Sequence, residues 1–168
     1  MEPAAQDNQG SPGIIWTIGH NYMSIERFVE LLRAHEIKPL IDVRPAPYSR
    51  RWTQFSRDVL ARRGQADGIA YCFLGRELGG KPSDLALCGP QGLPDYNAIA
   101  ATPLYQEGIK RLTAVARVRR PAFMCSDGDP SLRQRERLVA RTLHAQGWQA
   151  RHILTDGTIQ QEAQASLW

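Results

Sequence analysis

The amino-acid sequence predicts a single α/β domain with a mostly parallel sheet and helices on both faces. Short apolar runs alternate with segments in which apolar residues recur at helical spacing, and this alternation is typical of a parallel sheet with crossover helices. The chain has 168 residues, of which 42% are apolar and 23% charged. A chain of this length and balance fits one packed domain. The ligand crevice is expected at the carboxyl ends of the strands.

The first β–α–β unit is predicted near the start of the chain. Residues 1–13, which contain proline, glycine and small polar residues, are expected to form a flexible leader without a chemical role. The first strand is predicted over residues 14–19. Ser24 is the predicted N-cap of the following helix, since apolar residues recur at helical spacing until about His35. The strand predicted over residues 39–43 completes the unit.

Two prolines shape the exit from this second strand. Pro45 and Pro47 fix their own φ angles and restrict the residues before them. We therefore expect the loop to hold Arg44 and Tyr48 stiffly.

The middle of the chain is predicted to contain a helix, a strand and a long loop. The helix covers residues 53–63 and the strand residues 69–74. The strand leads into the glycine-rich segment 75–80, whose paired glycines indicate a close backbone approach or a positive φ. Residues 81–101 contain several prolines and glycines and are predicted to be a long irregular loop, a kind that is usually functional or mobile and can act as a lid.

The last third of the chain continues the α/β alternation. Asp129 is the predicted N-cap of a helix that has Pro130 at its first position and ends at Gly147. The other elements of this part are predicted to be a helix over 103–116, a strand over 121–125 and a last strand over 150–154. The α/β domain then spans residues 14–157, and residues 158–168 form a polar tail.

Three of the predicted strands end in reactive polar side chains. His20 follows the first, Asp42 and Arg44 end the second, and Cys125 and Asp127 end the fourth. Because the carboxyl ends of parallel strands share one edge of a sheet, these residues are expected to converge on one site. His20, Asp42 and Asp127 are the candidate proton-transfer residues.

Arg44 belongs to the densest cluster of cationic and aromatic residues in the chain. Its arginines suit bidentate recognition of phosphate, and its aromatic rings suit stacking on a base. In the alternative, Arg50 and Arg51 are solvated loop charges and Trp52 fills the core. The cluster comprises Arg44, Tyr48, Arg50, Arg51 and Trp52.

Two of the candidate catalytic residues also have structural interpretations. Asp42 lies inside an apolar run, where an unpaired carboxylate is costly. One interpretation is a buried ion pair with an arginine such as Arg44 or Arg76, and the other is general-base work. Both hold if the pair orients Arg44 toward a ligand. His20 suits acid–base work or capping of the following helix.

Cys125 lies beside a predicted helix N-terminus, which favours anions and thiolates. A tyrosine-phosphatase loop is excluded, because an arginine is required where Ser131 stands. A small buried thiol is therefore the favoured interpretation. Arg135 can reach back toward the crevice from its helix, whereas the other three arginines of that helix are expected to form a solvated basic face.

Composition excludes several classes of protein. The three cysteines lack the spacing of a disulfide framework or a zinc site, and no run approaches the roughly 20 apolar residues of a membrane span. The chain is therefore expected to be cytoplasmic. No cofactor motif is present. Four carboxylates near the crevice, Asp42, Glu77, Asp127 and Asp129, are of the kind that binds magnesium. The protein is nevertheless expected to be metal-free.

Four ordered motifs resemble the family designated domain of unknown function 488 (DUF488). They are Thr17–His20, Ile41–Arg44, Leu74–Gly80 and Met124–Pro130, and the resemblance extends from about Trp16 to about Gly157. It implies a compact α/β domain of bacterial and archaeal cytoplasm, without an assigned activity. In that family a Cys-His-Arg triplet commonly follows the Asp-Pro cap. Here only the arginine is kept, as Arg135.

Several classes of function follow from these residues. The first is an enzyme that binds a phosphate-bearing substrate, such as a nucleotide or a nucleic-acid component. Its substrate-binding residues would be Arg44, Tyr48, Arg76, Glu77, Cys125 and Arg135. The alternative is a non-catalytic module that binds nucleic acid through residues 44–52 and the helix at 130–146, or a regulatory protein. The formal charge of +4 permits an anionic partner in each case.

Overall fold

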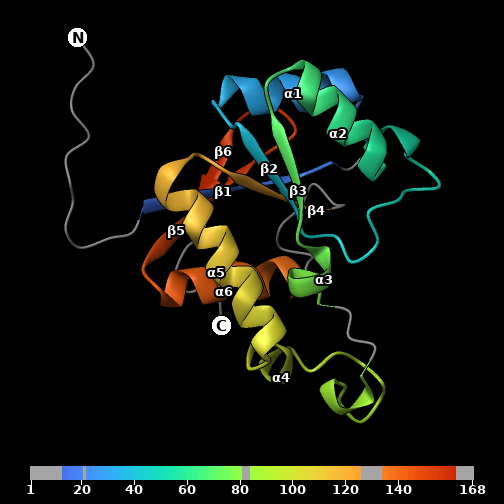
Figure 1. Cartoon of the computed structure of the whole chain (residues 1–168), viewed down its shortest axis with the longest axis vertical. Helices are drawn as coiled ribbons and strands as arrows, with labels where there is room; N and C mark the ends of the chain where they lie inside the picture. The colour runs from blue at the N-terminus through green and yellow to red at the C-terminus, as the bar shows by residue number, and fades with distance from the viewer. Residues whose placement is uncertain (1–12, 21, 81–83, 126–133, 162–168) are drawn as a thin grey trace.

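The computed structural model confirms a single α/β domain built on a mostly parallel sheet (Figure 1). It describes residues 13–20, 22–80, 84–125 and 134–161, with the backbone alone at residues 125 and 134–137. The strand order across the sheet is β3-β2-β4-β1-β5-β6, and neighbouring strands are parallel except for β5 and β6. The strands are β1 (Gly13–Gly19), β2 (Pro39–Asp42), β3 (Ala70–Phe73), β4 (Ala122–Cys125), β5 (Trp148–Ile153) and β6 (Ile159–Gln161).

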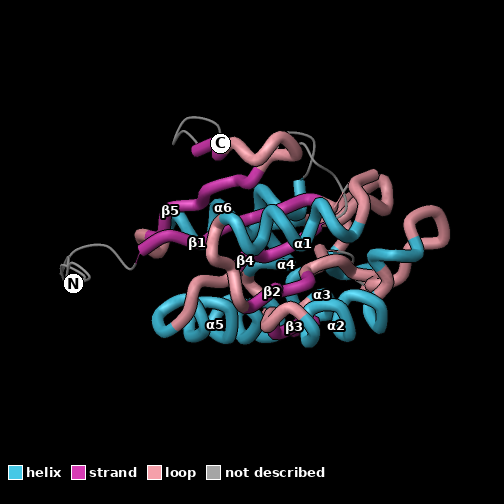
Figure 2. The backbone as a smooth tube through the Cα atoms, turned by 90° about the horizontal axis from the view of Figure 1, so that it is seen from above, coloured by secondary structure: helices cyan, strands magenta, loops and turns pink. Residues whose placement is uncertain are grey.

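Helices cover both faces of the sheet: α1 and α2 lie above the strands in Figure 1, and α5 and α6 lie below them. Figure 2 gives the view from above. The described helices are α1 (Ile25–Ala34), α2 (Arg57–Ala66), α3 (Gly75–Leu78), α4 (Tyr96–Ala100), α5 (Pro103–Val118) and α6 (Gln134–Ala145), with short 3₁₀ turns η1 (Thr53–Phe55) and η2 (Leu85–Leu87). Helices α1 and α2 pack on one face, and α3 to α6 on the other. Right-handed crossovers produce this division, because the chain moves across the sheet in opposite directions in its two halves.

The alternation of side chains along the strands divides the core into two layers. In β1, Ile15 packs under α5 and α6, whereas Trp16 and Ile18 pack under α1. In β4, Phe123 faces the α5 side and Met124 faces the α1 side. The central strands β1, β2 and β4 are buried and mostly apolar on both sides, as expected where a parallel sheet is covered on both faces.

Local signals placed most elements within a few residues. Ser24 is the N-cap of α1, where its Oγ accepts from the backbone N–H of Arg27 at 3.1 Å. Thr102 caps α5 in the same way, with Pro103 at the first position. The predicted start of α6 at Asp129–Pro130 lies outside the described residues.

Three predictions of secondary structure need correction. The helix predicted over residues 53–63 is interrupted by Ser56, whose extended backbone separates η1 from α2. The predicted irregular loop contains α4, because the Asp95 carboxylate caps the N–H groups of Asn97 and Ala98. Strand β6 was not predicted; the turn at Gly157 returns the chain along β5, and backbone pairing forms a strand without an apolar pattern.

Candidate functional site

The strand order places a switch point at the carboxyl end of β4. Strand β4 lies between β1 and β2. Helices α1 and α2, which follow β1 and β2, cover one face, whereas α6, which follows β4, packs on the other. The chain therefore leaves neighbouring strands toward opposite faces, and ligands of open α/β sheets bind at such a point.

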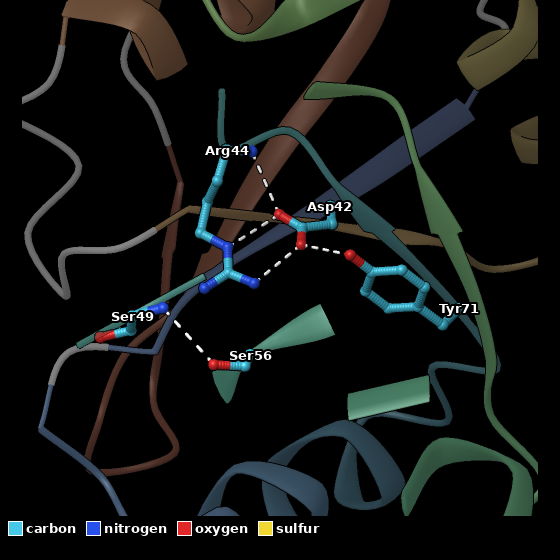
Figure 3. Close-up of polar contacts among 5 residues, drawn as sticks. All are labelled: Asp42, Arg44, Ser49, Ser56 and Tyr71. Atoms are coloured by element: carbon cyan, nitrogen blue, oxygen red, sulfur yellow. Dashed lines mark hydrogen bonds and ion pairs between the residues drawn. The ribbon is translucent and has the colours of Figure 1, made fainter. Parts of the chain in front are cut away.

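Asp42 and Arg44 form a buried ion pair at this edge (Figure 3). The side chain of Asp42 is 0% exposed and that of Arg44 is 5% exposed. Arg44 donates from Nε to Oδ1 at 2.9 Å and from Nη2 to Oδ2 at 2.8 Å. Its backbone N–H also donates to Oδ1 at 3.1 Å. The partner of Asp42 is thus Arg44, the nearer of the two arginines considered from the sequence.

Tyr71 completes this pair from the neighbouring strand β3. Its hydroxyl donates to Oδ2 of Asp42 at 2.5 Å. Burial raises the pKa of Tyr71 above its ordinary value, and the hydrogen bond to Asp42 raises it further, so the hydroxyl stays a proton donor. Sequence reasoning did not select Tyr71, because an aromatic residue in an apolar strand is indistinguishable from a core residue. The contact depends on the register that pairs Leu40 with Tyr71.

The four contacts fill the acceptor positions of the Asp42 carboxylate, which has about four lone-pair sites. The carboxylate therefore fixes the guanidinium of Arg44. In Figure 3 the second terminal nitrogen of that guanidinium points toward Ser49. The edge of Arg44 that does not contact Asp42 thus faces the loop between β2 and α2.

Hydrogen bonds hold the loop that faces Arg44. Ser49 Oγ accepts from the backbone N–H of Trp52 at 2.8 Å, and the N–H of Ser49 is 3.5 Å from Ser56 Oγ. The backbone N–H of Arg57 donates to the carbonyl of Pro47 at 2.8 Å. Trp52 packs against the core beneath α1. These contacts fix the loop in addition to its prolines.

The loop exposes the other members of the cationic and aromatic cluster. Tyr48 is 65% exposed, and Arg50 and Arg51 are also exposed. The guanidinium of Arg51 lies 5.1 Å from the centre of the Trp52 ring. Trp52 therefore has the core role considered from the sequence, whereas Tyr48 presents its ring to solvent.

His20 lies at the same edge of the sheet, directly after β1. It is 3% exposed, and its ring stacks on Phe55 with the ring centroids 4.5 Å apart. Phe55 packs in turn against Phe28 of α1. His20 and Asp42 thus come from strands on either side of β4, with His20 packed on the α1 face.

The glycine-rich segment after β3 brings α3 against the Arg44 loop. A Cβ atom on Gly75 would lie 1.8 Å from the carbonyl oxygen of Arg44, and one on Gly79 would lie 2.9 Å from Pro45. Gly80 has a φ of 64°. The predicted close approach and positive φ are both confirmed. These glycines are needed because no side chain fits between the two backbones.

Two candidate residues of α3 point away from the Asp42–Arg44 pair. Arg76 is exposed. Glu77 contacts α5, where one of its carboxylate oxygens lies 3.7 Å from Arg111. Its other carboxylate oxygen is buried and has no hydrogen-bond partner among the described residues. Neither residue contributes to the buried pair through the contacts of the described residues.

The remaining candidates lie where the structure gives no side-chain description. Strand β4 places the backbone of Cys125 beside Gly19, at the centre of the edge. The thiol of Cys125, the side chain of Arg135 and all of Asp127 lie outside the described part. Within the described part, no group of three or more His, Cys, Asp or Glu residues is arranged to hold a metal ion, and no helix is long and apolar enough to cross a membrane.

Comparisons with known proteins give one family and no individual relative. Searches of curated proteins and of solved structures find no significant match to the chain. The model of the family described as domain of unknown function DUF488 matches residues 24–142. This range contains β2, β3, β4 and the Asp42–Arg44–Tyr71 network. The chain therefore belongs to the DUF488 family.

Proposed function

We propose that the carboxyl edge of the sheet binds a phosphate-bearing small ligand, such as a nucleotide or a nucleic-acid component, and that Arg44 contacts its phosphate. The observation that carries this proposal is the buried bidentate contact between Asp42 and Arg44 at the switch point. A guanidinium held in this way keeps a fixed orientation, and its planar fork matches the oxygens of a phosphate.

The energetics of the pair favour a binding role. Burying two charges costs several kcal/mol per ion, and an apolar pair of similar volume is often at least as stable. The edge of Arg44 that does not contact Asp42 carries N–H groups that can donate to a phosphate oxygen. Because the acceptor positions of Asp42 are filled, we assign it a positioning role for Arg44 and not general-base work.

The other candidates supply the rest of this proposed site. The exposed ring of Tyr48 suits stacking on a base, and the exposed Arg50 and Arg51 suit additional phosphate contacts. His20 is the proposed proton-transfer group, since an imidazole is the side chain best suited to that task near neutral pH. If the protein is an enzyme, His20 is the residue whose loss would abolish turnover with least effect on ligand affinity.

Further ligand contacts are proposed from the segment that follows β4 and from α3. Cys125, Asp127 and Arg135 flank the centre of the edge in the sequence, and Arg76 lies on the exposed side of α3. These residues suit a ligand that extends beyond its phosphate.

Isothermal titration of the protein with nucleotides, sugar phosphates and inorganic phosphate tests the proposal. We expect one small phosphate compound to bind in a salt-tolerant manner, and the Arg44→Lys variant to lose at least about tenfold in affinity, because lysine cannot form the bidentate contact. Arg62→Lys, an exposed change on α2, is the matched control and should bind as the wild type does.

Two results would count against this function. One is a folded Arg44→Lys protein that keeps the wild-type Kd. The other is binding of polynucleotides alone with a steep loss at higher salt, which would favour the nucleic-acid module over residues 44–52 and 130–146.

A further inference from the structure

Two cations precede their strands at the edge of the sheet opposite the candidate site, and a third lies in the middle of β5, level with the start of β4. Lys38 directly precedes β2, Arg120 lies two residues before β4, and Arg151 is in β5. We call these three residues the basic edge. Leu40 pairs with Ala122 across β2 and β4, so Lys38 and Arg120, each two residues earlier, are neighbours at the start of their strands. None of the three belongs to the candidate site.

Two of these arginines share one aromatic ring. The guanidinium carbon of Arg120 lies 4.4 Å from the centre of the Trp16 ring, and that of Arg151 lies 5.7 Å from it. Trp16 is 5% exposed, so its ring supports the guanidinium groups and is itself covered. Stacking on an aromatic ring orients a guanidinium and leaves its N–H groups available in the plane for an anion.

The positive charge here is only partly neutralised by nearby carboxylates. Arg120 lies 3.9 Å from Glu36, but Arg120 is 44% exposed and Glu36 is 81% exposed, so water screens this pair. Nε of Arg151 is buried and has no hydrogen-bond acceptor among the described residues. Because this nitrogen is closed to solvent, an anion that binds from solvent would contact Arg151 through its terminal N–H groups.

Neutralisation of helix dipoles does not explain these positions. Arg33 and Arg117 lie in the last turns of α1 and α5, where they interact favourably with the helix carboxyl ends. The members of the basic edge lie beyond those helices or within a strand. Their positions therefore have another cause.

We propose that the basic edge binds the sugar-phosphate backbone of a nucleic acid strand. From β2 to β5 the sheet order includes three strand-to-strand steps, so the backbones that carry Lys38 and Arg151 lie on the order of 14 Å apart. This span exceeds a single phosphate group and suits several phosphates in a row. A membrane surface fits less well, because Val118 is the one large exposed apolar side chain in the described segments that carry these cations.

The proposed contacts are charge-assisted hydrogen bonds without base readout. Arg120 and Arg151 donate to phosphate oxygens from either side of Trp16 in the strand order, and Lys38 adds a third charge. Such binding depends on salt and is weakly dependent on sequence.

Fluorescence anisotropy with a labelled 20-nucleotide single-stranded DNA, at several salt concentrations, tests this proposal. We expect wild-type binding that weakens steeply with salt. The Arg120→Gln/Arg151→Gln variant should lose at least about tenfold in affinity. The slope of log K against log salt should fall by about 1.4, since each phosphate contact to a single strand contributes about 0.7 and two contacts are removed. Lys38→Gln, a change of an exposed side chain, should reduce the slope by about 0.7 without a change in folding.

The Arg62→Gln/Lys110→Gln variant is the matched control, because it removes the same charge from exposed positions on α2 and α5. Equal losses in the control and in the basic-edge variant would overturn the proposal, as would wild-type protein that does not bind the DNA. Stronger binding to phosphatidylserine vesicles than to DNA would assign the edge to membranes. The Arg120→Gln/Arg151→Gln variant should bind the small phosphate compound as the wild type does, so this test succeeds or fails separately from the small-ligand test.

Discussion

Replacement of the buried Asp42–Arg44 pair gives the sharpest test of the candidate site. Asp42→Leu leaves the guanidinium of Arg44, which is 5% exposed, without its counter-charge, and Arg44→Met leaves a carboxylate that is 0% exposed. Removal of one partner of such a pair costs about 3–5 kcal/mol, whereas replacement of both by apolar residues is often neutral. The two single variants should therefore be much less stable than the double variant.

Tyr71 must be included in this cycle, because its hydroxyl donates to Asp42. The four proteins are therefore made in a Tyr71→Phe background, which leaves no hydroxyl without an acceptor. Urea unfolding followed by circular dichroism gives the free energies of unfolding. In a protein of this size a loss of 3–5 kcal/mol corresponds to a fall in Tm of about 10 °C.

Ligand binding separates the contribution of the Asp42–Arg44 pair to stability from its proposed role in phosphate binding. The double variant should fold and yet fail to bind the phosphate compound. If the double variant is as unstable as the sum of the single variants, the charges do not compensate one another in the folded protein. If it binds the ligand with the wild-type Kd, Arg44 is not the phosphate contact.

Three further predictions concern packing and titration. Gly75→Ala should lower the free energy of unfolding by about 1–3 kcal/mol in urea melts, because the alanine methyl group would overlap the carbonyl of Arg44. A stabilised variant would show that the backbone of α3 can move away from the Arg44 loop without cost. Burial raises the pKa of Tyr105 to about 12. The contribution of this tyrosine to the free energy of unfolding is therefore complete below pH 10 and is lost as the pH rises toward 12. Tyr105→Phe should reduce the absorbance change at 295 nm in this range, and an unchanged titration would contradict the assignment. The side-chain hydrogen bond from Thr158 lowers the pKa of Asp156. Thr158→Val should therefore raise the pKa of Asp156 toward its ordinary value in an NMR titration. An equal pKa in both proteins would exclude this hydrogen bond as the cause.

The pH dependence that follows from Asp156 has a definite sign. A carboxyl whose pKa is lower in the folded state contributes stability above its unfolded pKa, and this contribution is lost as the pH falls through the folded pKa. The group is fully exposed, so salt should weaken the effect.

The predictable part of the fold consisted of features determined by neighbours in the chain. Ser24, the predicted N-cap of α1, and Pro103, the first residue of the helix predicted over 103–116, mark helix starts by their own hydrogen-bonding and backbone chemistry. The paired glycines after β3 indicated a close approach that the packing of Gly75 and Gly79 on the Arg44 loop confirms. The interruption at Ser56 also had a local signal, because Ser56 is the N-cap of α2 and serine is a preferred N-cap residue, but the prediction of one helix over residues 53–63 did not use it.

The candidate site was predictable only as an edge of the sheet. The sequence placed His20, Asp42 and Arg44 after strands, but it left Arg44 and Arg76 as equal partners for Asp42. Strand pairing and the fold of the following loop decided for Arg44 and added Tyr71. Such contacts join residues on different strands, and no local pattern reports them.

The sequence by itself determined the α/β class, the approximate limits of most elements and the edge where polar residues collect. These properties follow from periodicity, helix caps and the backbone preferences of glycine and proline, which act over a few residues. Only the tertiary structure decided that Tyr71 completes the buried pair and that Arg120 and Arg151 meet on Trp16. Both results depend on strand order and register, which arise from packing between segments far apart in the chain.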